Sequence, residues 1–178
     1  MTHEILIAGF GGQGVMLMGQ LLSEAGMNTG KFVTWLPSYG PEMRGGTANC
    51  SVMISDETVG SPIAVDPSAA ILMNIQSYDK FESVVRPGGL LLINSSLIEK
   101  QSSRTDIKQY LIPANTIAAE LGDTRVANMV MLGAFLKASG ALNLDVIMEA
   151  LEHKLPPHRR NLLPMNRQAL EKGMALVN

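Results

Sequence analysis

The chain has 178 residues, of which 46% are hydrophobic and 17% charged, and its formal net charge is −2. This length suits a single domain with a substantial core. The charge balance argues against a nucleic-acid or anionic-membrane binder, which needs a concentrated basic surface. No apolar run approaches the roughly 18–20 residues of a membrane-spanning helix. The start of the chain, MTHEILIAGF, lacks the basic region and cleavage site of a signal peptide, so none is expected.

Cysteine and histidine are scarce, and Cys50 is the only cysteine. A single thiol excludes an internal disulfide framework and predicts a reducing, cytoplasmic location. It cannot hold an iron–sulfur cluster alone, because such clusters take several thiolates. His153 and His158 are separated by two prolines and cannot share a helical face, so no metal site is predicted. Cys50 lies within an apolar run and is expected to pack in the core.

Short apolar runs alternate with longer amphipathic ones in the first part of the chain, which is typical of an α/β domain. Apolar EILIAG predicts a strand that is buried on both faces. TANCSVMIS predicts a later strand, paired through the turn SDET with the short segment ETVGSP. The elements predicted in this part are strands at 4–9, 31–36 and 47–55 and a helix at 15–27.

The second part of the chain continues the alternation and then becomes helical. Asn115 and Asn143 are expected N-caps, and Gly122 is an expected C-terminal stop. No repeat or linker interrupts the chain, so we predict one domain over residues 1–178. Its expected fold is a Rossmann-like, three-layer α/β domain with a mostly parallel sheet and C-terminal helices. The elements predicted here are strands at 69–74, 89–94 and 109–114 and helices at 76–85, 115–122, 125–140, 143–155 and 166–178.

The stretch GFGGQGVMLMGQ follows the first strand, and Gly9, Gly11 and Gly14 have the spacing G-x-G-x-x-G. Such a turn brings the backbone close to a ligand, and the next helix offers an anion its free N–H groups and about half a positive charge. Gly11, Gly12, Gln13 and Gly14 are therefore candidate binding residues through their backbone N–H groups. Alternatively, the glycines only permit close packing at a sharp turn.

A nicotinamide dinucleotide site needs more than this glycine loop. An acidic residue should end the second strand, about 20 residues farther on, to bind the ribose. That strand ends in TWLPSYG, and the first acidic residue beyond it is Glu42. The loop also lacks the Lys-Ser/Thr ending of a phosphate-binding P-loop. The start of a dinucleotide site is thus present without its continuation, and bound NAD is not expected.

The segment SYGPEMRGG forms a glycine- and proline-rich loop between two predicted strands. Loops at strand ends commonly carry function on a rigid scaffold. Arg44 offers a planar fork of donors for a carboxylate or phosphate, and Gly45 and Gly46 allow close approach. With Tyr39 and Glu42 they form a second group of candidate binding residues. Alternatively, Glu42 and Arg44 form only a surface ion pair, worth about 0–1 kcal/mol.

The combination of GFGGQGV, SYGPEMRGG and ISDETVGSP closely resembles the gamma subunit, or gamma domain, of the 2-oxoacid:ferredoxin oxidoreductases. The resemblance continues through IPANTIAAELGDTRVANMVMLGAFL to NRQALEKG and so spans nearly the whole chain. The family contains the pyruvate, 2-oxoglutarate and branched-chain ketoacid enzymes, and the indolepyruvate enzyme is built from a similar domain.

The resemblance implies a place in a hetero-oligomeric oxidoreductase. The complete enzymes oxidatively decarboxylate a 2-oxoacid on thiamine diphosphate, transfer the acyl group to coenzyme A, and pass electrons through iron–sulfur clusters to ferredoxin. Alpha and beta subunits hold thiamine diphosphate and magnesium, and a ferredoxin-like delta subunit holds the clusters. The gamma subunit is linked with coenzyme A access and with closing the site. The lone cysteine and the lack of a Gly-Asp-Gly thiamine segment agree with this division of labour.

Within such a complex, residues 11–15 and 39–46 are predicted to face coenzyme A or the other subunits. Arg44 is the first choice for an anion contact, and no catalytic residue is assigned. Two alternatives stay open. One is a stand-alone Rossmann-type module that binds a nucleotide or coenzyme A without redox activity, and the other is a purely structural assembly subunit.

Overall fold

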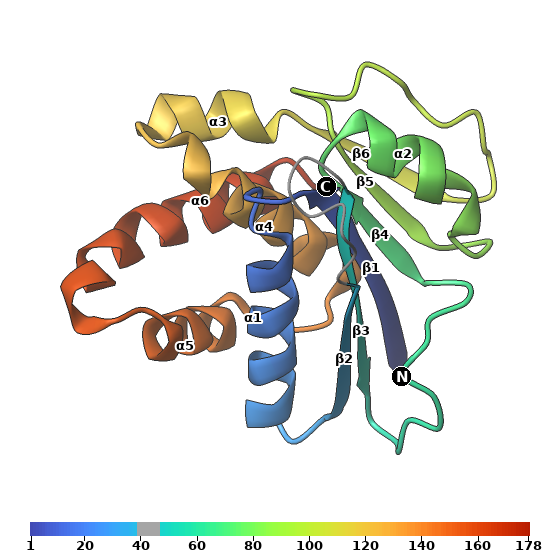
Figure 1. Cartoon of the computed structure of the whole chain (residues 1–178), viewed down its shortest axis with the longest axis horizontal. Coiled ribbons are helices and arrows are strands. Elements are labelled where there is room, and N and C mark those ends of the chain that lie inside the picture. Colours follow the sequence, from blue (N-terminus) through green and yellow to red (C-terminus); the bar gives the residue numbers. More distant parts are fainter. Residues whose placement is uncertain (39–46) are drawn as a thin grey trace.

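The computed structural model describes residues 1–38 and 47–178 and is built around a six-stranded sheet of order β2-β3-β1-β4-β5-β6 (Figure 1). β4 is parallel to β1, β5 to β4, and β6 to β5. β3 runs antiparallel to both of its neighbours. The predicted α/β domain with a mostly parallel sheet is confirmed. The strands are β1 (Thr2–Phe10), β2 (Phe32–Ser38), β3 (Thr47–Ser55), β4 (Ala69–Leu72), β5 (Leu90–Asn94) and β6 (Lys108–Ile112).

Helices cover the two faces of the sheet unequally. In Figure 1, α1, α4, α5 and α6 lie on the left of the sheet, and α2 lies on the right. No helix in the described part of the chain is both long enough and apolar enough to cross a membrane. The α-helices are α1 (Val15–Asn28), α2 (Ile75–Phe81), α3 (Ala114–Leu121), α4 (Ala127–Ser139), α5 (Leu144–Lys154) and α6 (Leu163–Ala175). Short 3₁₀ turns are η2 (Glu82–Val84), η3 (Thr124–Val126) and η4 (Pro157–Leu162).

β1 shows why its run of apolar residues forms a central strand. Successive side chains of a strand point to opposite faces. Ile5 and Ile7 enter the larger core, with α1, α4, α5 and α6. Leu6 and Ala8 enter the smaller core, beside Tyr78 of α2. Both faces of β1 are therefore buried, as predicted from EILIAG.

α4 is buried around its circumference, as its apolar composition predicts. The backbones of α4 and α6 approach closely, so that a Cβ atom at Gly133 would collide with the carbonyl of Leu170. A Cβ atom at Gly173 would likewise collide with the carbonyl of Val130. Glycine at these two positions lets α6 cover α4, and the C-terminal helices close the larger core.

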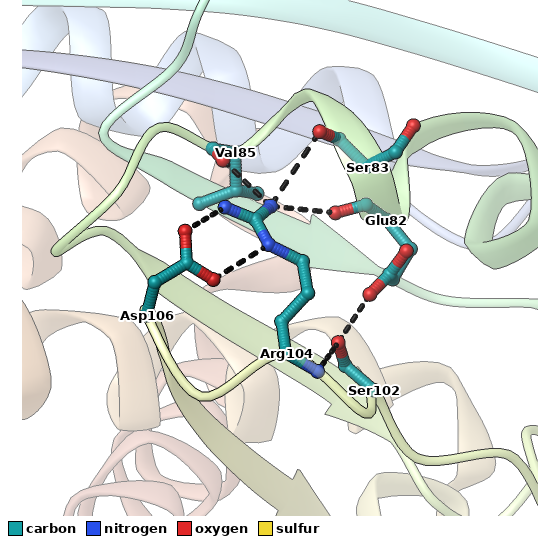
Figure 2. Close-up of polar contacts among 6 residues, drawn as sticks. All are labelled: Glu82, Ser83, Val85, Ser102, Arg104 and Asp106. Atoms are coloured by element: carbon teal, nitrogen blue, oxygen red, sulfur yellow. Dashed lines mark hydrogen bonds and ion pairs between the residues drawn. The ribbon is translucent and has the colours of Figure 1, made fainter.

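The connection between β5 and β6 contains no helix over residues 95–107 and is held by Arg104 instead (Figure 2). The Arg104 guanidinium donates two hydrogen bonds to Asp106, from Nε (2.9 Å) and from Nη2 (2.7 Å). Its Nη1 donates to the carbonyl of Val85, just beyond η2, at 2.7 Å. Ser102 donates to the Glu82 carboxylate in the same network. These hydrogen bonds hold the connection against η2 and the residue that follows it.

Two predictions at strand and helix ends are wrong. Residues 57–62 form no strand, and β3 pairs with β1 and β2 instead of with this segment. β3 lies between β2 and β1 in the sheet, and this place buries its residues Cys50 and Val52 in the larger core. Both edges of β3 are therefore already paired. Asn115 is not an N-cap, because α3 begins after Pro113. Its side-chain oxygen accepts a hydrogen bond from Asn94 (2.8 Å), so a tertiary partner replaces the expected local one.

The other two predicted cap residues lie at helix ends in the structure. Gly122 is the C-cap of α3, in the left-handed conformation that favours glycine. Asn143 is the N-cap residue of α5, although its side chain makes no capping hydrogen bond. The predicted helix 76–85 is divided into α2 and η2, and the last helix begins at Leu163, three residues earlier than predicted.

Candidate functional site

The glycine loop joins β1 to α1 and is closed by Gln13. The Gln13 side-chain oxygen accepts a hydrogen bond from the Phe10 N–H (2.6 Å), and the Gln13 N–H donates to the Phe10 carbonyl (3.2 Å). Gly12 and Gly14 have φ angles of 89° and 75°, the left-handed region that glycine adopts at little cost. The sharp turn between β1 and α1 therefore depends on these residue types.

The glycines of this loop fall into two kinds. A Cβ atom at Gly9 would lie 2.7 Å from the Gln13 side-chain oxygen and 2.8 Å from Met73 Cβ. A Cβ atom at Gly14 would collide with the side chain of Asn128. At Gly12, in contrast, no heavy atom lies within 4 Å of the added Cβ. Close packing thus accounts for Gly9 and Gly14, whereas the space around the Cβ position of Gly12 is empty.

The N-terminus of α1 supplies donors beside Gly12. Gly14 is its N-cap, no side chain caps this end, and the Gly14 carbonyl accepts the Met18 N–H (3.1 Å). The N–H groups of the first helical turn have no intrahelical acceptor, and they lie at the positive end of the helix dipole. This is the donor set that the sequence predicts for an anion.

A crevice lies where the connections from two neighbouring strands, β1 and β4, lead to opposite faces of the sheet. α1, which follows β1, packs on the larger core, whereas α2, which follows β4, packs on the smaller one. β1 and β4 are neighbours, and open α/β sheets bind ligands at such switch points, outside the carboxyl ends of the strands. The crevice has a volume of about 180 Å³. It is lined by Gly12, Gln13, Met73, Asn115, Thr124, Arg125 and Ala127.

Asparagine side chains form the polar floor of this end of the sheet. Asn94, at the end of β5, is fully buried and donates to the Met73 carbonyl (3.2 Å) and to Asn115. Asn128 donates to the Gly14 carbonyl (3.4 Å) and so ties α4 to the glycine loop. Asn74, which follows β4, caps α2 by accepting the Ser77 N–H (3.0 Å). Together they join the glycine loop to β4, β5, α3 and α4.

The polar floor is not saturated with hydrogen bonds. Asn74 Nδ2 and Asn94 Oδ1 are buried and have no partner among the described residues. Sequence reasoning did not single out these two asparagines. The signal was available, because each asparagine ends an apolar run, AAILMN or GLLLIN, and the carboxyl ends of parallel strands share one edge.

Arg125, at the mouth of the crevice, was also missed. Its guanidinium donates to Asp123 through Nε (3.0 Å to Oδ1) and Nη2 (2.7 Å to Oδ2), and its side chain is 82% exposed. This hydrogen bonding holds the pKa of the Asp123 carboxyl below its usual range. The Arg125 guanidinium is therefore a cation at the crevice, and a bound anion would compete for it with the Asp123 carboxylate.

An apolar hollow lies on the other side of the glycine loop. It has a volume of about 260 Å³ and adjoins the first turn of α1 and the start of β3. Its walls include Phe10, Met16, Leu17 and Ala48. Thus Gly12 borders both a polar crevice and an apolar hollow, and its surroundings suit a ligand or partner of mixed polarity.

The second predicted group of site residues stays a prediction. Tyr39, Glu42, Arg44, Gly45 and Gly46 lie outside the described residues. The structure therefore gives positions only for the first group, residues 11–14.

Resident metal or thiol chemistry finds no support in the described part of the chain. No cluster of three or more His, Cys, Asp and Glu residues there could hold a metal ion. Burial raises the pKa of the Cys50 thiol to about 11, so the thiol stays protonated near neutral pH. Cys50 is fully buried and packs in the larger core, which confirms its predicted role.

The chain is similar to proteins of ketoacid metabolism. The family description "Pyruvate ferredoxin/flavodoxin oxidoreductase" matches residues 4–176. Ketoisovalerate oxidoreductase subunit VorA of Methanothermobacter thermautotrophicus is 39% identical over 172 residues, which are 96% of this chain and 35% of VorA. 2-Oxoglutarate synthase subunit KorC of Methanothermobacter marburgensis is 34% identical and is matched over 97% of its length, and over 99% of this chain. The chain thus spans about a third of VorA and nearly all of KorC.

Solved structures agree with these relatives. The gamma subunit of a keto/oxoacid ferredoxin oxidoreductase from Geobacter sulfurreducens has a TM-score of 0.82 at 30% identity, covering 97% of this chain and 96% of that subunit. The 2-oxoglutarate:ferredoxin oxidoreductase of Magnetococcus marinus, with 2-oxoglutarate, coenzyme A and succinyl-CoA bound, has a TM-score of 0.90 at 25% identity. That match covers 98% of this chain and 31% of the other. Since the family match extends over residues 4–176, this chain belongs to the pyruvate ferredoxin/flavodoxin oxidoreductase family.

Proposed function

We propose that the chain is the gamma-type subunit of a multi-subunit 2-oxoacid:ferredoxin oxidoreductase. The complex would oxidatively decarboxylate a 2-oxoacid to its acyl-CoA and pass the electrons to ferredoxin. The observation that carries this proposal is the correspondence with KorC over 97% of that subunit's length at 34% identity. This correspondence supports a gamma-type role within a larger enzyme.

The proposal assigns the redox chemistry to companion chains. Alpha and beta subunits would hold thiamine diphosphate and magnesium, and a ferredoxin-like delta subunit would hold the iron–sulfur clusters. The lone cysteine supports this division, because its thiol is buried and protonated. A cytoplasmic location of the complex stays a prediction from the sequence.

For this chain's own contribution, we propose a contact with coenzyme A beside Gly12. Coenzyme A is an anion through its phosphates, and its thiol accepts the acyl group. The free N–H groups at the start of α1 and the Arg125 guanidinium suit the phosphates, and Asn115 and Thr124 add polar groups. The crevice, at about 180 Å³, is smaller than the roughly 300 Å³ of an ordinary ligand pocket. It would therefore take one end of coenzyme A, and companion chains would cover the rest.

Turnover by the reconstituted complex tests the subunit assignment. Ferredoxin reduction by a 2-oxoacid and coenzyme A is measured with the companion chains alone, with this chain alone, and with all of them together. We expect turnover only from the full mixture, since the redox groups and the coenzyme A contact lie on different chains. Decarboxylation by the isolated chain, or full turnover without it, would contradict the assignment.

The crevice also supports a second candidate, a stand-alone module that binds coenzyme A or a nucleotide. Titration calorimetry of the isolated chain with coenzyme A and with NADH separates the possibilities. Weak coenzyme A binding that tightens in the complex favours a gamma-type subunit. Tight binding without companions favours the module, and no binding in either state favours a purely structural subunit.

A further inference from the structure

One part of the sheet has an uncovered face. On the side opposite α1, α2 packs against β4 and β1, but no helix of the described residues covers β2 and β3 (Figure 1). Phe32 and Leu36 of β2 point to this side and are 48% and 43% exposed. Large apolar side chains on a sheet face normally pack against another layer, and no helix of residues 1–38 and 47–178 supplies that layer here.

Strand register places β3 and β1 side chains next to those of β2 on this face. Phe32 pairs with Ser55, which pairs in turn with Thr2 on β1. Two residues along, Met53 lies between Thr34 and Glu4. Directly opposite residues on paired strands lie on the same face about 5 Å apart. The exposed side chains of β2 therefore adjoin Ser55 and Met53 of β3, which are only 3% and 5% exposed and lie at the floor of this face.

The connection between β3 and β4 forms a rim around the lower end of this face. Ile63 and Val65 in this irregular segment are 60% and 77% exposed. A hollow of about 360 Å³ lies between the segment and the sheet. Met53 and Ser55 line its floor, and Ile63 and Val65 line its side. A hollow of this size is large enough to receive apolar side chains of another protein.

The rim is acidic. Glu4, Glu57 and Asp66 all line the hollow. Arg86 lies 3.9 Å from Glu4, whereas Glu57 and Asp66 form no ion pair with any residue that the structure describes. The region thus has an apolar centre and a negative edge, the arrangement of a protein interface with an apolar core and a polar rim.

We infer that this open face, made of Phe32, Leu36, Met53, Ile63 and Val65 with Glu57 and Asp66, is the docking site of a companion subunit whose contact element carries apolar side chains flanked by Lys or Arg. The inference rests on the proposed function, because it requires a companion chain. The apolar residues would fill the hollow, and the cations would pair with the acidic rim.

Charge argues against a second copy of this chain as the occupant. A two-fold contact places the same surface patch of both copies together. The acidic rims, with Glu57 and Asp66, would then face each other, and like charges oppose such a contact. A companion with a cationic contact element gains from the same rim.

Two double variants test the inference in the complex with its companion chains. Ile63→Asp with Val65→Asp removes the apolar contacts, and Glu57→Lys with Asp66→Lys reverses the rim charge. Neither should unfold the chain, because these side chains are exposed, and circular dichroism and Tm verify this. Analytical ultracentrifugation measures the dissociation constant for the companion chains at low and high salt.

The apolar double variant should bind the companion chains about 30-fold more weakly. The charge-reversed variant should bind about tenfold more weakly and lose most of the salt dependence. Matched controls are Met27→Asp, an exposed apolar residue of α1, and Glu149→Lys, an exposed acid of α5. Both controls should bind within about twofold of the wild type.

The outcomes separate this inference from the proposed function. Wild-type binding with equally tight binding of both double variants overturns the inference and leaves the subunit assignment intact. Failure of the wild-type chain to bind companion chains overturns both. Self-association that the double variants abolish, with companion binding unchanged, identifies a second copy as the occupant and overturns the inference.

Discussion

The crevice beside Gly12 and the network around Arg104 are both rich in polar groups, but they use them differently. Around Arg104, donors and acceptors meet: the guanidinium bonds Asp106 and the Val85 carbonyl (Figure 2). Gln109 in addition donates to the Ser102 carbonyl. Behind the crevice lining, Asn74 and Asn94 each keep a buried polar atom without a partner in the described structure. The Arg104 network holds a loop, whereas the crevice is lined by polar groups such as Asn115, Thr124 and the exposed Arg125.

This difference predicts which substitutions change stability and which change activity. Gly30 provides a matched reference for the glycine loop. It has a φ angle of 77°, and no heavy atom lies within 4 Å of an added Cβ. Gly30→Ala therefore measures backbone strain alone, about 1 kcal/mol.

The largest effect is expected from Gly14→Ala. Its φ angle of 75° strains alanine, and the new Cβ would also collide with Asn128. We expect a loss of about 3 kcal/mol in the free energy of unfolding, measured by urea denaturation. A loss no greater than that of Gly30→Ala would show that the contact with Asn128 is not tight.

Arg104→Ala should lower stability without changing the crevice. The substitution removes the Asp106 pair and the donor to the Val85 carbonyl, so the connection between β5 and β6 loosens. We expect Tm to fall by about 5 °C, measured by differential scanning calorimetry. The KM for coenzyme A of the assembled complex should not change, and a rise in this KM would contradict the separation of the two regions.

Arg44→Ala tests the part of the predicted site that lies outside the described residues. If Arg44 binds an anion of coenzyme A, its loss should raise the KM for coenzyme A about tenfold in ketoacid-dependent ferredoxin reduction. The isolated chain should keep its Tm. Arg159→Ala, in η4, is the matched control and should change neither quantity. Unchanged turnover and coenzyme A dependence in the Arg44 variant would remove Arg44 from the site.

Gly12→Ala should change function more than its stability cost suggests. It carries the same kind of strain as Gly30→Ala, because its φ angle is 89° and its surroundings are open. The two variants should therefore lose similar free energy of unfolding. Only the methyl at position 12 borders the crevice, so we expect a coenzyme A KM about three to five times higher for this variant. Equal KM values for both variants would contradict the proposed contact.

The smallest effect concerns pH. The hydrogen bonds from Arg104 hold the pKa of Asp106 below its ordinary value of 3.8. A lowered folded-state pKa contributes stability above the unfolded value, and this contribution is lost as pH falls through the folded value. The Tm difference between wild type and Arg104→Ala should therefore be full at pH 6 and shrink below about pH 4. A constant difference would mean that Asp106 is not the main partner.

Much of the fold could be predicted because its signals are local. The apolar run of β1, the amphipathic pattern of α1 and the glycine that ends α3 each depend on neighbouring residues. The pairing of β3 could not be predicted this way. Its alternation shows that it is a strand, but its register with β1, such as Ile7 opposite Cys50, joins residues far apart in the chain.

The candidate site divides in the same manner. The glycine loop has a spacing that is visible in the sequence, and its place between β1 and α1 is confirmed. Asn128 carries no local motif, and the only local signal of Asn94 is that it ends the apolar run GLLLIN. Their position beside the loop depends on the order of β1, β4 and β5 and on the packing of α4.

By itself, the sequence determined the kinds of element, the turn after β1, the lack of a cysteine cluster and the resemblance to gamma subunits. Each of these depends on residue type and short spacing. Tertiary structure alone decided that Asn115 bonds Asn94 instead of capping α3, and that no helix of the described residues covers one face of β2 and β3. Both outcomes depend on contacts between residues that are far apart in the sequence. A side chain forms hydrogen bonds with the partner that packing places beside it, and short sequence patterns do not specify that partner.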